Sequence, residues 1–86
     1  MNEDFSMTAK VLSVGERLEV EVISAAYAEG VYWVIVGSDT EIFDIDGNSI
    51  EKNDIQVGDT VKIEYNGQVM MSYPPQIVAR SISISK

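Results

Sequence analysis

The sequence predicts an all-β fold, a small five-stranded barrel of OB type with one short helical turn. Val, Ile, Tyr and Thr recur in short runs separated by Gly, Asn and Asp, as is typical of strands joined by turns. Some runs alternate between apolar and polar residues, and no window carries the apolar stripe of a helix. A chain of 86 residues suits one domain, so we expect residues 1–86 to form a single barrel. An SH3-like barrel or a two-sheet sandwich are the alternatives.

The first two strands are expected at residues 7–14 and 17–24. In the second strand three apolar residues alternate with two glutamates, which places the apolar side chains in the core and the carboxylates in water. Gly15 and Glu16 suit a two-residue type II′ turn, because the first central position of that turn needs a positive φ. The two strands are therefore expected to form a local hairpin.

The third strand is expected at residues 31–36, which are apolar on both faces. We expect Trp33 and Ile35 to be its core residues. Alternatively, Trp33 and Tyr32 stack on a base or a sugar, as aromatic residues on OB faces do. Before this strand, residues 25–29 are expected to make one helical turn.

A short strand is expected at residues 41–45, followed by a turn at residues 46–48 and a return of the chain. Residues 53–59 resemble a short helical turn that ends in a Gly-Asp β-turn. The fourth main strand is expected at residues 60–65, with its apolar side chains, Tyr65 included, facing inward. Asn66-Gly67 is a strong signal for a type I′ hairpin, with residues 68–72 as the return strand.

The last strand is expected at residues 77–85. Arg80 falls on the same parity as the buried isoleucines of this strand, so either a bulge shifts the phase there or Arg80 lies at the rim of the barrel. Two prolines precede the strand and stop the earlier pairing, because proline has no N–H to donate. The Tyr73-Pro74 bond is a candidate for the cis form, since X-Pro bonds adopt it at little cost in tight turns.

Charge and composition disfavour several classes of function. The net charge is −8, from 14 acidic and 6 basic residues, which opposes binding to nucleic acid or to an anionic membrane surface. No apolar run is long enough to insert into a membrane. Because the chain has no His and no Cys, it lacks the commonest general base and a thiol nucleophile. We therefore expect no enzymatic activity and no cofactor.

One signature near the end of the chain points to a family. It combines Gly, Ser-Tyr-Pro and Gln at the positions Gly67, Ser72, Tyr73, Pro74, Gln76, Ala79 and Ile82, and it follows a Val-Gly-Asp-Thr-Val segment at residues 57–61. This pattern resembles the YobA-like domains, a bacterial family of unknown function. The resemblance implies a small OB-like domain without an assigned activity, often secreted or lipid-anchored.

The sequence leaves two cellular locations open for this protein. Residues 1–6 are acidic and polar, whereas a secretory signal has a basic start and an apolar stretch. The chain also lacks the lipobox Cys of a lipid-anchored protein. We expect a secreted or lipid-anchored protein if a signal was trimmed from the sequence, and a cytoplasmic protein otherwise.

The leading hypothesis for function is a non-catalytic module that binds an unknown protein or peptide. Aromatic and proline side chains in loops give rigid apolar contacts, and Met gives adaptable ones. We expect the contact residues to be Tyr65, Met70, Tyr73 and Pro74. In the alternative reading, Tyr73 caps the barrel and the prolines fix the crossover.

Two further hypotheses are kept. The acidic loops bind a divalent cation or a small ligand through Asp44, Asp46 and Asp54, because hard cations prefer several oxygen ligands; alternatively these acids form solvated turns. Oligonucleotide binding follows from analogy with other OB folds, and the net charge opposes it.

Overall fold

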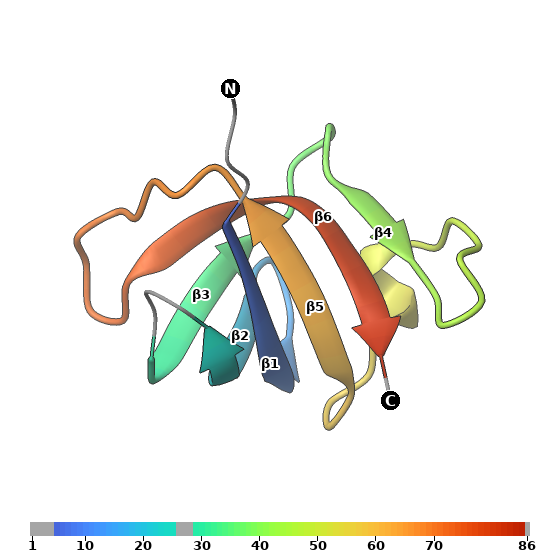
Figure 1. Ribbon diagram of the computed structural model, residues 1–86, viewed down its shortest axis with the longest axis horizontal. Coiled ribbons are helices and arrows are strands. Elements are labelled where there is room, and N and C mark those ends of the chain that lie inside the picture. The colour runs from blue at the N-terminus through green and yellow to red at the C-terminus, as the bar shows by residue number, and fades with distance from the viewer. Residues whose placement is uncertain (1–4, 26–28, 86) are drawn as a thin grey trace.

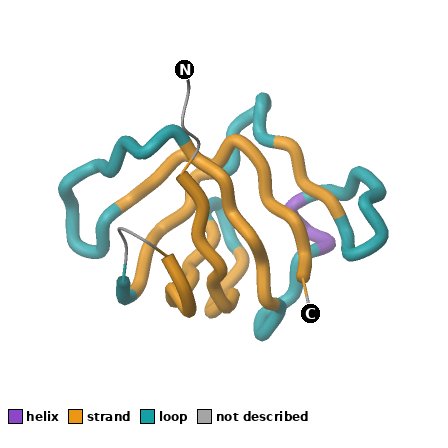
Figure 2. The backbone as a smooth tube through the Cα atoms, viewed as in Figure 1, coloured by secondary structure: helices purple, strands orange, loops and turns teal. Residues whose placement is uncertain are grey.

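Short strands form nearly all the regular structure of the computed structural model, which describes residues 5–25 and 29–85 (Figures 1 and 2). The described elements are β1 (Phe5–Val14), β2 (Leu18–Ala25), β3 (Val31–Ile35), β4 (Glu41–Phe43), the 3₁₀ turn η1 (Lys52–Asp54), β5 (Thr60–Tyr65) and β6 (Gln76–Ser85). Within these ranges, no helix has the length and apolar character needed to span a membrane.

Five strands close into a barrel. They are hydrogen-bonded in the order β3-β2-β1-β5-β6, and a parallel pairing between β3 and β6 completes the ring. β4 lies outside the ring and pairs in parallel with β6. The helical turn η1 lies before β5, the fourth strand of the ring. The predicted five-stranded barrel of OB type with one helical turn is thus confirmed.

The interior of the barrel is filled by apolar side chains from alternate positions of each strand. Full burial of one large aliphatic side chain contributes about 1.5–3 kcal/mol. No polar or charged side chain is buried among the described residues. The fully buried side chains of largest volume are Met7, Leu18, Ile63, Ile77, Ile82, Val11, Val20, Val34 and Val61.

The predicted β1–β2 hairpin is present, but its predicted turn is wrong. Gly15 is not among the glycines with a positive φ, and residues 15–17 form a three-residue connection between Val14 and Leu18. The reason is an irregularity in β1, where the register shifts by one residue at Leu12. Without that shift, the pairing of Val11 with Val20 would extend to a two-residue loop.

The face assignment predicted for β3 is also wrong. Tyr32 and Val34 point into the core, with exposed fractions of 8% and 0%, whereas Trp33 and Ile35 lie half-buried on the outer face. A strand that is apolar on both faces carries no alternation from which its inward side can be read. The helical turn expected over residues 25–29 falls largely on residues 26–28, which lie outside the described residues.

Between β4 and β5 the predicted elements are present in shorter form. β4 ends at Phe43, two residues before the predicted limit, and the return of the chain is a single bridge between Phe43 and Ser49. Gly47 supplies a positive φ of 88° to the intervening turn, as expected from its sequence.

The predicted hairpin at Asn66-Gly67 does not form. A type I′ turn needs a positive φ at both central residues, and of the two only Gly67 has one, at 90°. β5 instead pairs with β1 on one edge and with β6 on the other. Because the barrel takes up both edges of β5, residues 68–72 have no place beside it, and they form a loop.

A bulge in β6 resolves the position of Arg80. Glu64 pairs with Ser81 whereas Tyr65 pairs with Ala79, so Arg80 is an extra residue between two pairs of the ladder. The bulge shifts the phase of β6, which leaves Arg80 exposed while Ala79 and Ile82 face the core. Of the two alternatives predicted for Arg80, the bulge is confirmed.

Candidate functional site

Three large apolar side chains are exposed together on the loop between β5 and β6. This β5–β6 loop, residues 66–75, extends from the barrel on the side opposite β4 (Figure 1). The exposed fractions of Met70, Met71 and Tyr73 are 45%, 95% and 102%. We refer to these three residues as the apolar loop patch. Soluble domains expose single apolar side chains routinely, but neighbouring ones are typical of interaction sites.

Gln76 holds this loop in shape. Its backbone exchanges two hydrogen bonds with Met70, where Gln76 O accepts from Met70 N at 2.8 Å and Gln76 N donates to Met70 O at 3.2 Å. Its side-chain Nε2 donates to Ser72 Oγ at 3.2 Å, and Ser72 Oγ donates to Pro74 O at 2.7 Å. The Tyr73–Pro74 bond within this segment is cis. The loop is thus closed on itself around the apolar loop patch.

A second set of contacts joins the loop to the barrel. Trp33 N of β3 donates to Pro75 O at 2.9 Å, and Arg17 Nη1 donates to Gln76 Oε1 at 3.1 Å. The guanidinium of Arg17 also lies over the Trp33 ring, 4.7 Å from its centroid. These contacts tie the β5–β6 loop to the β1–β2 connection and to the outer face of β3.

The predicted contact residues divide between the loop and the core. Met70 and Tyr73 are both exposed in the same loop, and Pro74 is half-buried. Tyr65 is 2% exposed and packs inside the barrel, and burial raises the pKa of its phenol above 10.0. Its assignment to a contact surface is therefore wrong. The full exposure of Tyr73 also excludes the alternative in which it caps the barrel.

Sequence reasoning missed the residues that shape the site. Met71 is more exposed than Met70, yet the predicted set of contact residues contains Met70 and not Met71. Gln76 and Arg17 were not assigned any joint role, because they are 59 positions apart in sequence and meet only when the barrel closes. The Ser-Tyr-Pro-Pro-Gln spacing was the available signal, since it contains both Ser72 and Gln76.

The three aspartates predicted to bind a cation are not brought together. In the described residues, 5–25 and 29–85, no group of three Asp or Glu side chains could hold a metal ion. Asp44 Oδ1 instead accepts the backbone N–H groups of Asp46 and Asn48, both at 2.9 Å, and the bond from Asn48 lowers the pKa of Asp44. Asp54 Oδ2 accepts the backbone N–H of Glu51 at 3.0 Å. The solvated-turn alternative describes Asp44 and Asp54 better.

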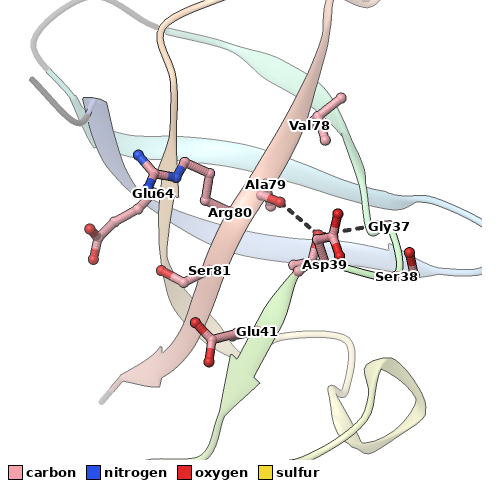
Figure 3. Close-up of a pocket in the computed structure, with 10 residues that line it drawn as sticks. Gly37, Ser38, Asp39, Glu41, Glu64, Val78, Ala79, Arg80 and Ser81 are labelled. Atoms are coloured by element: carbon pink, nitrogen blue, oxygen red, sulfur yellow. Dashed lines mark hydrogen bonds between the residues drawn. The ribbon is translucent and has the colours of Figure 1, made fainter. Parts of the chain in front are cut away.

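A shallow cavity of about 550 Å³ lies on another side of the barrel, between the β3–β4 loop and β6 (Figure 3). Thr40 is one of the lining residues, and its Oγ1 donates to Ala79 O at 2.6 Å and accepts from Gly37 N at 3.0 Å. The charged side chains that line it are Asp39, Glu41, Glu64 and Arg80.

Comparisons with known proteins agree with the predicted resemblance. A family model described as a protein of unknown function, DUF3221, matches residues 7–85. The crystal structure of a yobA protein from Bacillus subtilis subsp. subtilis str. 168 is similar, with a TM-score of 0.66 and 17% sequence identity over 99% of this chain and 98% of that chain. At that identity the likeness shows the fold alone. No curated protein matches the chain.

Proposed function

Since the chain belongs to DUF3221, a family of proteins of unknown function, its activity must be inferred from its own surface, and we propose that it is a non-catalytic module that binds a protein or peptide through the apolar loop patch. The observation that carries this proposal is the joint exposure of Met70, Met71 and Tyr73 on a hydrogen-bonded loop. A fully exposed side chain contributes little to the packing of the monomer, so its apolar surface is free to be buried against a partner.

The chemistry of these side chains supports the proposal. Tyr and Met are enriched at the centres of protein interfaces, where Tyr offers a large contact area with few rotatable bonds. The loop is also held by Gln76 and Arg17 before any partner arrives. A surface that is already ordered loses less conformational entropy on binding, which favours affinity.

The side chains of the chain also support a non-catalytic role. Without His or Cys, proton transfer and nucleophilic attack would fall to carboxylates, lysines or hydroxyl groups. Asp44, Asp54 and Asp59 each use a carboxylate oxygen to accept a backbone N–H in their own turns. Acids engaged in this way stabilise turns and are poorly placed to transfer protons to a substrate.

The proposal is tested by capture with an immobilised domain and a matched pair of double variants. In the first variant Met71→Ser and Tyr73→Ser remove the centre of the patch. In the second, Ile45→Ser and Val57→Ser remove two other exposed side chains, which are 55% and 66% exposed. Loss of a central aromatic contact costs about 2 kcal/mol or more, or roughly 30-fold in affinity.

We expect partners captured by the wild-type domain to be lost with the first variant and retained with the second. Urea unfolding of both variants establishes that they are folded. If the folded patch variant captures the same proteins in the same amounts as the wild type, the patch is not the binding surface and the proposal is wrong.

A further inference from the structure

The apolar loop patch lies in the longest uncharged part of a strongly acidic chain. Residues 65–79 contain no Asp, Glu, Lys or Arg, although the chain carries a net charge of −8. The acids concentrate elsewhere, with six of them between Asp39 and Asp54 and Lys52 as the base among them. Figure 1 shows β4 and the loops that follow it on the side of the barrel opposite the β5–β6 loop.

This distribution decides how two copies of the chain can meet. Contact through the side that carries β4 would bring two acidic clusters together, and like charges close to each other repel. Contact through the β5–β6 loops places those clusters at the two far ends of the pair. The barrel measures 31 × 30 × 24 Å, whereas the Debye length is about 8 Å at physiological ionic strength, so the remaining repulsion is largely screened.

The segment that carries the patch also has no charge that would oppose contact with its own copy. In a twofold contact the same surface faces itself, so residues 65–79 of one copy bring no like charge against residues 65–79 of the other. Because residues 65–79 offer no charge, they give neither a basic nor an acidic partner an electrostatic advantage. The attraction then comes from burial of apolar surface, and the apolar loop patch of a second copy provides such a surface.

We propose that a second copy of this chain docks on Met70, Met71 and Tyr73 around a twofold axis. This inference rests on the proposed function and names the partner. Met71 and Tyr73 are almost completely exposed, and Met70 is about half exposed. At about 200 Å² for each large side chain, the three together expose roughly 500 Å² per copy. Mutual burial of about 1,000 Å² lies below the size of standard interfaces, so the dimer is weak and transient.

The test is sedimentation equilibrium of the purified chain between about 10 µM and about 1 mM protein, which brackets a weak dissociation constant. The patch variant carries Met71→Glu and Tyr73→Glu, and the control carries Ile45→Glu and Val57→Glu, so both have the same net charge. We expect the wild type and the control to dimerise with rising concentration while the patch variant stays monomeric. The serine pair Met71→Ser and Tyr73→Ser replaces the glutamate pair if the latter does not fold.

Ionic strength provides an independent readout. Added salt screens the repulsion between two chains of charge −8, so we expect dimerisation to strengthen as salt rises from about 0.05 M to about 0.5 M. A wild-type chain that stays monomeric at about 1 mM overturns the inference. Equal loss of dimer in the control, or dimerisation that weakens with salt, overturns it as well. If the pure chain is monomeric but the patch variant still loses captured proteins, self-association fails and the proposed function stands.

Discussion

Gly67, at the start of the β5–β6 loop, offers a sharp test of how that loop leaves the barrel. Its φ is 90°, and a Cβ added there would lie 2.6 Å from Cδ1 and 3.0 Å from Cζ of the Phe5 ring. Gly67→Ala therefore meets two penalties. An alanine in the left-handed region costs about 1–2 kcal/mol, and displacing a packed ring costs about 1–3 kcal/mol. The expected loss of unfolding free energy is about 2–5 kcal/mol.

The two penalties are separated by matched variants. Gly58 has a φ of 93° and no atom within 4 Å of an added Cβ, so Gly58→Ala meets the backbone penalty alone. In a Phe5→Ala background the ring is absent, so Gly67→Ala should then cost about as much as Gly58→Ala. The coupling energy of the Phe5–Gly67 cycle is therefore about 1–3 kcal/mol.

Urea unfolding followed by fluorescence of the single Trp33 measures these free energies. Phe5→Ala has a cost of its own, because the ring packs on the core and against Tyr65 with centroids 5.9 Å apart. The cycle removes that cost from the comparison. If Gly67→Ala and Gly58→Ala are equally destabilising and Phe5→Ala changes neither, the close approach of the ring to Gly67 is refuted.

Three further perturbations address the loop, an acidic turn and the core. Gln76→Ala removes both side-chain hydrogen bonds of that residue, so we expect faster amide exchange at Met70 with little change in global stability. Because the pKa of Asp44 is lowered in the folded state, its carboxylate stabilises the fold at pH values above the ordinary pKa of 3.8. This stabilisation is lost as the pH falls through the pKa of the folded state, so the stability advantage of wild type over Asp44→Asn should shrink in acid. Because burial raises the pKa of Tyr65, its neutral phenol favours the folded state, and this contribution is complete below pH 10.0. It is lost as the pH rises through the pKa of the folded state, so wild type should lose stability more steeply than Tyr65→Phe in alkali.

Hydrogen exchange by NMR checks the first of these, and unchanged protection of Met70 in Gln76→Ala would show that Gln76 does not hold the loop. Urea unfolding as a function of pH checks the other two. A constant difference between wild type and Asp44→Asn down to pH 2, or parallel alkaline curves for wild type and Tyr65→Phe, would contradict the hydrogen-bonded turn and the buried phenol respectively.

Where the sequence alternates, its pattern predicts the barrel well. The period of two placed Leu18 and Val20 of β2, and Val61 and Ile63 of β5, in the core, and the structure agrees. The same logic detected a conflict at Arg80, which a bulge resolves. The burial of these residues is predicted correctly because each strand has one apolar and one polar face, so the local pattern and the burial agree.

Predictions failed where closure of the barrel overrides a local signal. Asn66-Gly67 favours a hairpin locally, but the two neighbours of β5 come from distant parts of the chain. The prediction of a type II′ turn at Gly15 failed because the sequence gives no sign of the one-residue shift in strand register at Leu12. Turn type depends on register, and register is decided by pairings across the whole barrel.

The candidate site was predictable only in part for the same reason. An exposed Tyr73 follows from its place beside two prolines, where no strand continues. The contact of Arg17 with Gln76 depends on the parallel pairing of β3 with β6, which brings the first connection of the barrel beside the last. No spacing in the sequence encodes that encounter.

The central claim is that the apolar loop patch is presented by an ordered loop. Backbone order parameters from ¹⁵N relaxation of the monomeric wild-type chain test it directly across residues 70–76. We expect order parameters of about 0.85 in the wild type, as for rigid backbone, and lower order parameters in Gln76→Ala. Values below about 0.6 in the wild type would show that Gln76, Ser72 and Arg17 do not hold the loop, and would contradict the account.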